Sequence, residues 1–111
     1  MAKKYLRKSE FRIDFNPNHQ GVDKKPHPAY ISARKGHKYK ANTITHSRYI
    51  NGNETFLIGE NPDKISKNKR KTRISPPFWQ NENQFGKEKL SNFRFSRQSK
   101  IKIKKYNKKF K

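Results

Sequence analysis

Apolar residues alternate with polar ones in several short runs of this chain, which is the spacing of half-buried β-strands. Near the N-terminus, Phe11, Ile13 and Phe15 keep a period of two. Arg12 and Asp14 fall between them, so they would point to the opposite face. The pattern predicts a short strand over these five positions.

The clearest β-hairpin pattern lies near the middle of the chain. Two strand-like runs, residues 29–34 and 39–47, flank a short basic turn that contains Gly36. Glycine suits such a turn because it adopts positive φ angles without steric cost. Antiparallel pairing of the two runs would bring their outer ends, at His27 and His46, close together.

The stretch after this hairpin predicts smaller elements. Residues 49–50 and 55–58 flank an Asn-Gly turn, which indicates a second hairpin. The basic run 64–73 has one apolar residue and is expected to be a solvated loop. Residues 74–79 should be extended, because their two prolines cannot donate to a sheet ladder. Residues 80–86 are expected to form a polar loop.

The C-terminal segment, residues 89–111, predicts a basic helix. Ser96 suits an N-cap because its hydroxyl can accept a hydrogen bond from an N–H of the first turn. Ile103, Tyr106 and Phe110, spaced three and four apart, would form one apolar face. Part of the segment also alternates like a strand. A terminal lysine-rich strand has little to pair with, so we favour the helix.

These elements predict a mostly β fold, either a small, partly open barrel or a twisted antiparallel sheet. Its 111 residues suffice for one small domain. We expect a β-rich domain over residues 1–88 and a basic C-terminal helix or arm over 89–111. Only 29% of the residues are hydrophobic, so the core is small and part of the chain is expected to order only against a partner.

The net charge of the chain indicates the class of partner that it binds. The chain has 29 Lys and Arg residues against 8 Asp and Glu, a net charge of +21. Like charges at this density repel one another, which favours an anionic partner. Nucleic acid, either RNA or DNA, is the leading candidate, because binding to its phosphates releases counterions. We expect phosphate contacts with little sequence specificity. The predicted contacts are Lys35, Lys38, Lys40, Lys69, Arg70, Lys71, Arg73, Arg94, Arg97, Lys102, Lys104 and Lys105.

Aromatic residues are interleaved with the C-terminal cations. Phe93, Phe95, Tyr106 and Phe110 could stack on unpaired bases, since every base has an apolar face. The alternative is that they form the core of a small protein. The sequence leaves both interpretations open.

Neither a metal nor a cofactor is expected. The chain has no cysteine, and its four histidines lack the spacing of a metal site. RNA cleavage without a metal needs a general base, a general acid and a cation for the developing negative charge. Within one hairpin, these groups are offered by His27, Thr45, His46, Ser47 and Arg48, which are the candidate catalytic residues. The simpler interpretation is that these residues only suit strands and turns.

The run HPAYIS…KGHKYKANTITHS resembles the start of a MazF/PemK-type toxin barrel. In that family one strand opens with a basic residue, Pro and a hydrophobic run, as in residues 27–31. A later strand ends in a Thr-Ser-like element, as in residues 44–47. The resemblance spans residues 25–60 and implies a small SH3-like barrel, often a homodimer, that cleaves single-stranded RNA. It would place the cleavage residues at His27 and Thr45, with Ser47 as a third candidate.

The chain also departs from that family. His27 stands where the family usually has Arg, and the large charge and basic tail are atypical. The departures suggest a barrel that kept the fold and turned to binding, because fold alone does not determine function.

Three functions therefore stay open. The first is nucleic-acid binding, and the second is a metal-independent endoribonuclease. The third is a basic structural component of a phage particle, a ribosome or a mobile-element complex, or a binder of an acidic protein. We expect a cytoplasmic or nucleoprotein location and no membrane partner, because the sequence shows no secretion signal and no bilayer-length apolar run. The oligomeric state is not indicated.

Overall fold

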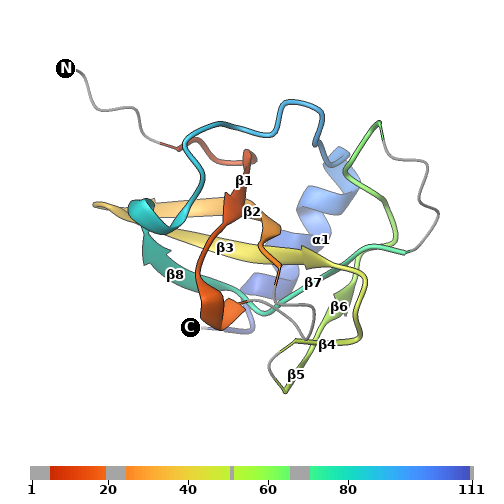
Figure 1. The fold of residues 1–111 in the computed structure, drawn as a ribbon. Helices are drawn as coiled ribbons and strands as arrows, with labels where there is room; N and C mark the ends of the chain where they lie inside the picture. Colours follow the sequence, from red (N-terminus) through yellow and green to blue (C-terminus); the bar gives the residue numbers. More distant parts are fainter. Residues whose placement is uncertain (1–5, 20–24, 51, 66–70, 111) are drawn as a thin grey trace.

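A computed structural model describes residues 6–19, 25–50, 52–65 and 71–110 of the chain. Strands dominate it, and one α-helix follows them near the C-terminus (Figure 1). In chain order the elements are β1 (Phe11–Asp14), the 3-10 helix η1 (Pro17–His19), β2 (His27–Lys35), β3 (Lys38–Thr45), β4 (Tyr49–Ile50), β5 (Asn53–Glu54), β6 (Phe56–Leu57), β7 (Arg73–Ile74), β8 (Phe78–Asn81), the 3-10 helix η2 (Glu82–Gln84) and α1 (Arg97–Asn107).

Six of the strands form one twisted antiparallel sheet. They follow the order β1-β2-β3-β7-β6, and β8 also pairs with β3. The strands β4 and β5 form a separate pair. This architecture confirms the prediction of a mostly β chain with a basic C-terminal helix, and of its two forms the open twisted sheet is the one observed.

The central hairpin forms as predicted. In β2 and β3, Ala29 lies opposite Thr43 and Lys35 lies opposite Lys38. Gly36 has a φ of 64° in the turn, which a side chain would disfavour. The register shifts next to Ser32, so β2 carries a bulge in the middle of the hairpin.

The other edge of β3 is shared by two strands. Its first half pairs with β8 and its second half pairs with β7. The two prolines between β7 and β8 lie where the ladder changes partner, because they have no N–H to donate. Ser75 bridges the change: its N–H donates to the Thr43 carbonyl (2.9 Å), and its hydroxyl accepts from the Thr43 N–H (2.8 Å).

Three sequence predictions after the central hairpin were wrong in part. The solvated loop expected over residues 64–73 ends earlier, because Thr72 is buried and Arg73 belongs to β7. The second hairpin uses residues 53–54, not 55–58, as its second arm, because its two-residue turn places Ile50 opposite Asn53. Phe56 instead pairs with Ile74 of β7. The polar loop expected from residue 80 starts later, because Gln80 and Asn81 still belong to β8.

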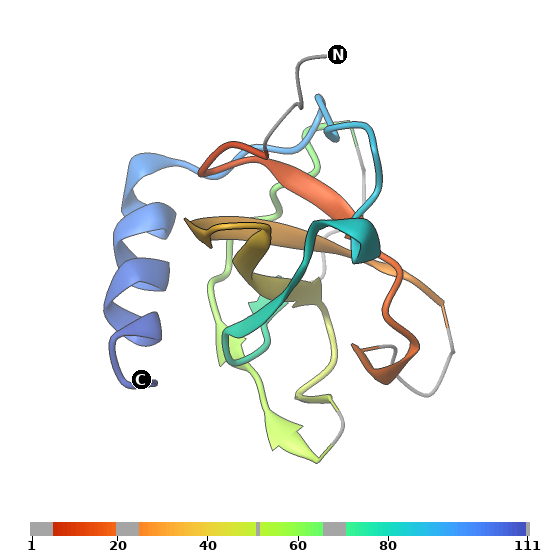
Figure 2. The same ribbon diagram turned by 90° about the vertical axis from the view of Figure 1, so that its left-hand side faces the viewer.

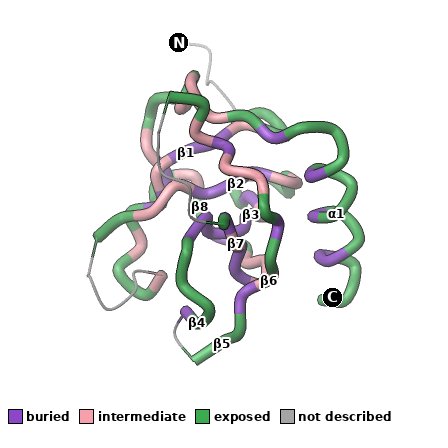
Figure 3. The backbone as a smooth tube through the Cα atoms, turned by 90° about the vertical axis from the view of Figure 1, so that its right-hand side faces the viewer, coloured by how far each residue is buried: buried purple, intermediate pink, exposed green. Residues whose placement is uncertain are grey.

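The apolar core lies on both faces of the sheet. Helix α1 stands along one side of the sheet (Figure 2), and buried positions recur along it (Figure 3). Its Ile103 and Tyr106 pack in one cluster with Phe11 and Tyr30. The second cluster uses neighbouring positions that point to the other face, among them Ala29, Ile31, Tyr39, Ala41 and Phe85.

Candidate nucleic-acid interface

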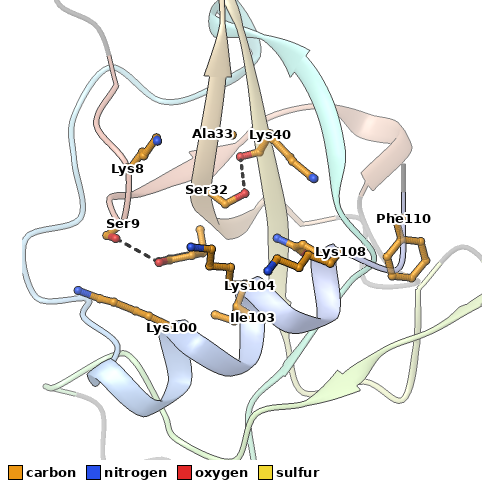
Figure 4. Close-up of a pocket in the computed structure, with 12 residues that line it drawn as sticks. Lys8, Ser9, Ser32, Ala33, Lys40, Lys100, Ile103, Lys104, Lys108 and Phe110 are labelled. Carbon is orange, nitrogen blue, oxygen red and sulfur yellow. Dashed lines mark hydrogen bonds between the residues drawn. The ribbon is translucent and has the colours of Figure 1, made fainter.

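A basic groove lies between α1 and the β2–β3 hairpin (Figure 4). Its volume is about 640 Å³. No acidic side chain is among the described residues that line it. We call this site the lysine groove, and its five cations are Lys8, Lys40, Lys100, Lys104 and Lys108.

The helix supplies three of these cations from one flank. Lys100, Lys104 and Lys108 are four residues apart, so they lie one above another at a rise of about 6 Å per step. Like charges at this spacing destabilise a helix by roughly 0.2–0.5 kcal/mol per pair. An anion bound between them would relieve that repulsion.

The same helix carries a second set of lysines that does not line the groove. Lys102 and Lys105 on α1, and Lys109 just after its C-cap, are also exposed, but they are not among the lining residues of the groove. The two sets have equal charge and lie on the same turns. This segment therefore offers a matched comparison between three lysines that line the groove and three that do not.

The floor of the groove is apolar and aromatic. Tyr30 and Ile103 are buried there, and Ala33 and Phe110 line it as well. The Tyr30 hydroxyl lies 3.2 Å from the Ser9 hydroxyl (Figure 4). Burial raises the pKa of Tyr30 above its ordinary value, against a smaller opposing effect of the Ser9 hydrogen bond. The phenol is therefore neutral near pH 7 and adds no negative charge to the site.

The sheet wall is shaped by the bulge in β2. The Ser32 hydroxyl donates to the Lys40 carbonyl (3.2 Å), across the position where the register shifts. Bulges redirect side chains relative to a regular strand. The bulge therefore lies beside the half-buried Lys40, which faces the helix lysines across the groove.

Glu60 fixes the start of the helix wall. Its carboxylate accepts hydrogen bonds from the Ser96 N–H (3.0 Å), the Ser99 hydroxyl (2.6 Å) and Lys64 Nζ (2.8 Å). Burial alone would raise the pKa of Glu60, but the hydrogen bonds from Lys64, Ser99 and Ser96 outweigh it and lower the pKa from 4.5 to about 2. Ser96 is the N-cap, as predicted, and accepts from the Ser99 N–H (3.3 Å).

A pair of buried amides fixes the other end of the helix wall. Asn42 Nδ2 donates to Asn107 Oδ1 (2.8 Å), and Asn107 Nδ2 donates back to Asn42 Oδ1 (3.1 Å). Asn42 Nδ2 also lies 3.0 Å from the Ser75 carbonyl. Both side chains are buried, so the pair joins α1 to β3 at one defined position.

The structure distributes the predicted phosphate contacts widely. Lys40 and Lys104 line the groove, whereas sequence reasoning missed Lys8, Lys100 and Lys108. Two predicted residues, Lys69 and Arg70, lie outside the described residues. The predicted cations that are exposed away from the groove are Lys35, Lys38, Lys71, Arg94, Arg97, Lys102 and Lys105.

Arg73 has a different environment from the other predicted cations. It is half-buried in β7, and its guanidinium donates to the Thr55 hydroxyl and carbonyl, both at 2.7 Å. These bonds connect two neighbouring parts of the fold. We therefore leave Arg73 out of the proposed interface.

The candidate stacking residues are divided between the core and the groove. Phe95 and Tyr106 belong to the buried cluster, and Phe93 packs against it. Phe110 follows the helix, lines the groove and is 39% exposed. Three of the four aromatic residues therefore have the structural role that the sequence offered as the alternative.

The candidate catalytic residues meet at a second site, which we call the histidine pocket. It has a volume of about 260 Å³, and His27, Thr45, His46 and Ser47 line it. Thr72 lines it too, and its buried hydroxyl has no hydrogen-bond partner among the described residues. The hairpin thus brings together the residues that sequence reasoning had placed there.

The groups around the histidine pocket differ in part from those that the sequence predicted. The Thr45 hydroxyl is buried and accepts from the Ser47 N–H (3.1 Å). No lysine or arginine is among the described residues that line the pocket. Arg48, the expected cation, lies instead 3.4 Å from the Glu54 carboxylate.

A third polar site contains His19, whose Nδ1 lies 2.7 Å from the buried Asp14 carboxylate. Asp14 also accepts from Gln80 Nε2 (2.8 Å) and the Asn16 N–H (2.9 Å), so it joins β1, β8 and the turn after β1. In the part of the chain that the structure describes, no three His, Asp or Glu side chains gather as a metal site.

Within the described ranges, no helix has both the length and the apolar character needed to cross a bilayer. Comparisons with protein-family models, with curated proteins and with solved structures found no match to this chain. The likeness to MazF/PemK toxins therefore stays a prediction from two short motifs.

Proposed function

We propose that this protein binds nucleic acid through phosphate contacts in the lysine groove. One observation carries the proposal: five lysines from three separated parts of the chain converge on one groove, with no acidic side chain among its described lining residues. Unpaired lysines gathered in this way raise the local concentration of a polyanion and neutralise its phosphates.

The contacts expected in the groove have little sequence specificity. A lysine ammonium acts as a flexible point charge, so it recognises a phosphate without fixing which base is attached. The helix lysines form a row, which suits successive phosphates along a strand better than a single isolated anion.

A salt series tests the proposal. The wild-type protein should bind labelled single-stranded RNA and double-stranded DNA with a steep loss of affinity as salt rises. Replacing Lys100, Lys104 and Lys108 by Ala should lower the slope for RNA by about 2 units, because each lost contact removes about 0.7. The matched control replaces Lys102, Lys105 and Lys109 by Ala, with the same charge change.

The control separates the possible results. A smaller effect of the outer triple variant supports the groove as the contact surface. Equal slopes in both triple variants would contradict the groove, and absence of binding to either nucleic acid would contradict the function and favour an acidic protein partner.

A second function, endoribonuclease activity, has support from the histidine pocket. His27, His46, Thr45 and Ser47 line one pocket there, which offers groups for acid–base chemistry. RNA incubated with the protein and run on a denaturing gel tests it. Cleavage that His27→Ala abolishes and His37→Ala preserves would support an enzyme, because His37 lies on the hairpin turn beside Glu82 (3.4 Å). Intact RNA would contradict it.

A further inference from the structure

We propose that the lysine groove is a site for single-stranded nucleic acid, in which an unpaired base enters the groove against Phe110 while the lysines hold its phosphates. This inference rests on the proposed function and deepens it. A groove that only neutralised phosphates would need cations alone. The lysine groove also has an apolar floor.

The size of the groove suits a nucleotide. Pockets that enclose small ligands have volumes of roughly 300–1,000 Å³. The groove has about 640 Å³, bounded by α1 on one side and the hairpin on the other. A duplex keeps its base faces stacked inside, so it could touch the lysines but could not reach the floor.

The groove offers different surfaces to the base and to the phosphates of a nucleotide. Ala33 and Phe110 present apolar surface above the buried Ile103, which suits the face of a base. The ammonium groups belong to longer side chains around this surface, which suits the phosphates. The neutral Tyr30 phenol has its hydroxyl beside Ser9, so the aromatic floor is not negatively charged.

Phe110 is placed to act as the stacking platform. Its N–H donates to the Asn107 carbonyl (3.1 Å), so the residue is attached to the last turn of the helix. Its ring packs edge-on against Tyr106, with centroids 5.1 Å apart. Phe110 as a whole residue is 39% exposed, so part of its surface is open to a ligand.

An abasic strand tests this inference, since it has the phosphate charge without the bases. We measure affinities for a short polyuridine strand, for an abasic strand of the same length and for a duplex of that length. The variants are Phe110→Ala and, as a matched control, Phe15→Ala, because Phe15 is an exposed phenylalanine (52%) outside the groove.

The wild-type protein should bind the polyuridine strand roughly ten-fold more tightly than the abasic strand, from the stacking of one base. Phe110→Ala should reduce this ratio to less than about two-fold, with the affinity for the abasic strand unchanged. Phe15→Ala should leave the ratio as in the wild type. This set of results would support base entry.

Two other results would overturn the inference, and they differ from failure of the proposed function. Equal binding of the polyuridine and abasic strands would show that the bases do not contribute. A ratio that Phe110→Ala leaves intact would place base recognition elsewhere. In both cases phosphate binding by the lysines would stand, whereas absence of binding to all three probes would overturn both proposals.

Discussion

The lysine groove and the histidine pocket divide between them the groups that RNA cleavage would need in one place. The groove has five lysines but no histidine, aspartate or glutamate among its described lining residues. The pocket has two histidines and hydroxyl groups, but no lysine or arginine among its described lining residues.

This difference favours binding over catalysis. Stabilising the charge that develops during phosphoryl transfer is a major part of catalysis, and lysine or arginine beside the reacting phosphate is one common means of doing so. In this protein the five lysines gather in a groove that does not include the two histidines of the pocket. Under the proposed function, the high positive charge indicates the class of partner, and the positions of the lysines and histidines decide whether binding is accompanied by cleavage.

The largest expected effect comes from reversing the charge of the groove. Replacing Lys100, Lys104 and Lys108 by Glu should weaken binding to single-stranded RNA by about 100-fold or more at low salt, because three attractive contacts become repulsive. Fluorescence anisotropy measures the affinity. The control reverses Lys102, Lys105 and Lys109, and an equal loss there would contradict a special role for the groove.

The next effect concerns the attachment of the helix wall to the sheet. Asn107→Ala should destabilise the protein by about 1–3 kcal/mol, because it leaves the buried Asn42 amide without its partner. Urea denaturation measures the change, and Lys105→Ala serves as an exposed control on the same helix. A stability equal to the wild type would show that the amide pair does not fix the helix.

The pH dependence of folding tests the attachment at Glu60. Its pKa falls from 4.5 to about 2 on folding, so the carboxylate stabilises the native state fully above pH 4.5. That contribution is lost as the pH falls through 4.5 toward 2. Glu60→Gln should therefore cost about 1 kcal/mol near pH 7 and progressively less toward pH 2.

Urea midpoints across this pH range measure the difference between Glu60→Gln and the wild type. Glu54→Gln is the matched control, because Glu54 is exposed and lies beside Arg48 rather than at the helix start. A difference between Glu60→Gln and the wild type that does not shrink as the pH falls would contradict the role of the Glu60 carboxylate.

The smallest expected effect is at the histidine pocket. His27→Ala should change the affinity for single-stranded RNA by less than about two-fold, because no cation of the groove is lost. Anisotropy with the same RNA measures it. A large loss of affinity would show that the histidine pocket and the lysine groove belong to one binding surface, which contradicts the distinction between them.

The fold was predictable where local chemistry decides it. Gly36 in a basic turn indicated the central hairpin, and Ser96 indicated the helix start, since a positive φ and an N-cap each favour particular residues. The second arm of the second hairpin was predicted wrongly, because Phe56 could pair either with residues 49–50 or with β7. Tertiary pairing with Ile74 decides between them.

The site was less predictable than the fold. The spacing of Lys100, Lys104 and Lys108 was visible in the sequence, but the flank of the helix that faces the groove depends on Asn42 and Asn107, which are 65 positions apart. Stacking residues and core residues are both aromatic. The sequence alone therefore could not show that Phe95 lies in the core and that Phe110 lines the groove.

The most direct test of the account is an amide chemical-shift titration of the labelled protein with a short single-stranded RNA. The account predicts that the largest shifts cluster at Ser32, Lys40, Lys104 and Phe110, on the two walls and at the end of the groove. Largest shifts at His46 and Ser47, or along the outer lysines of the helix, would contradict it.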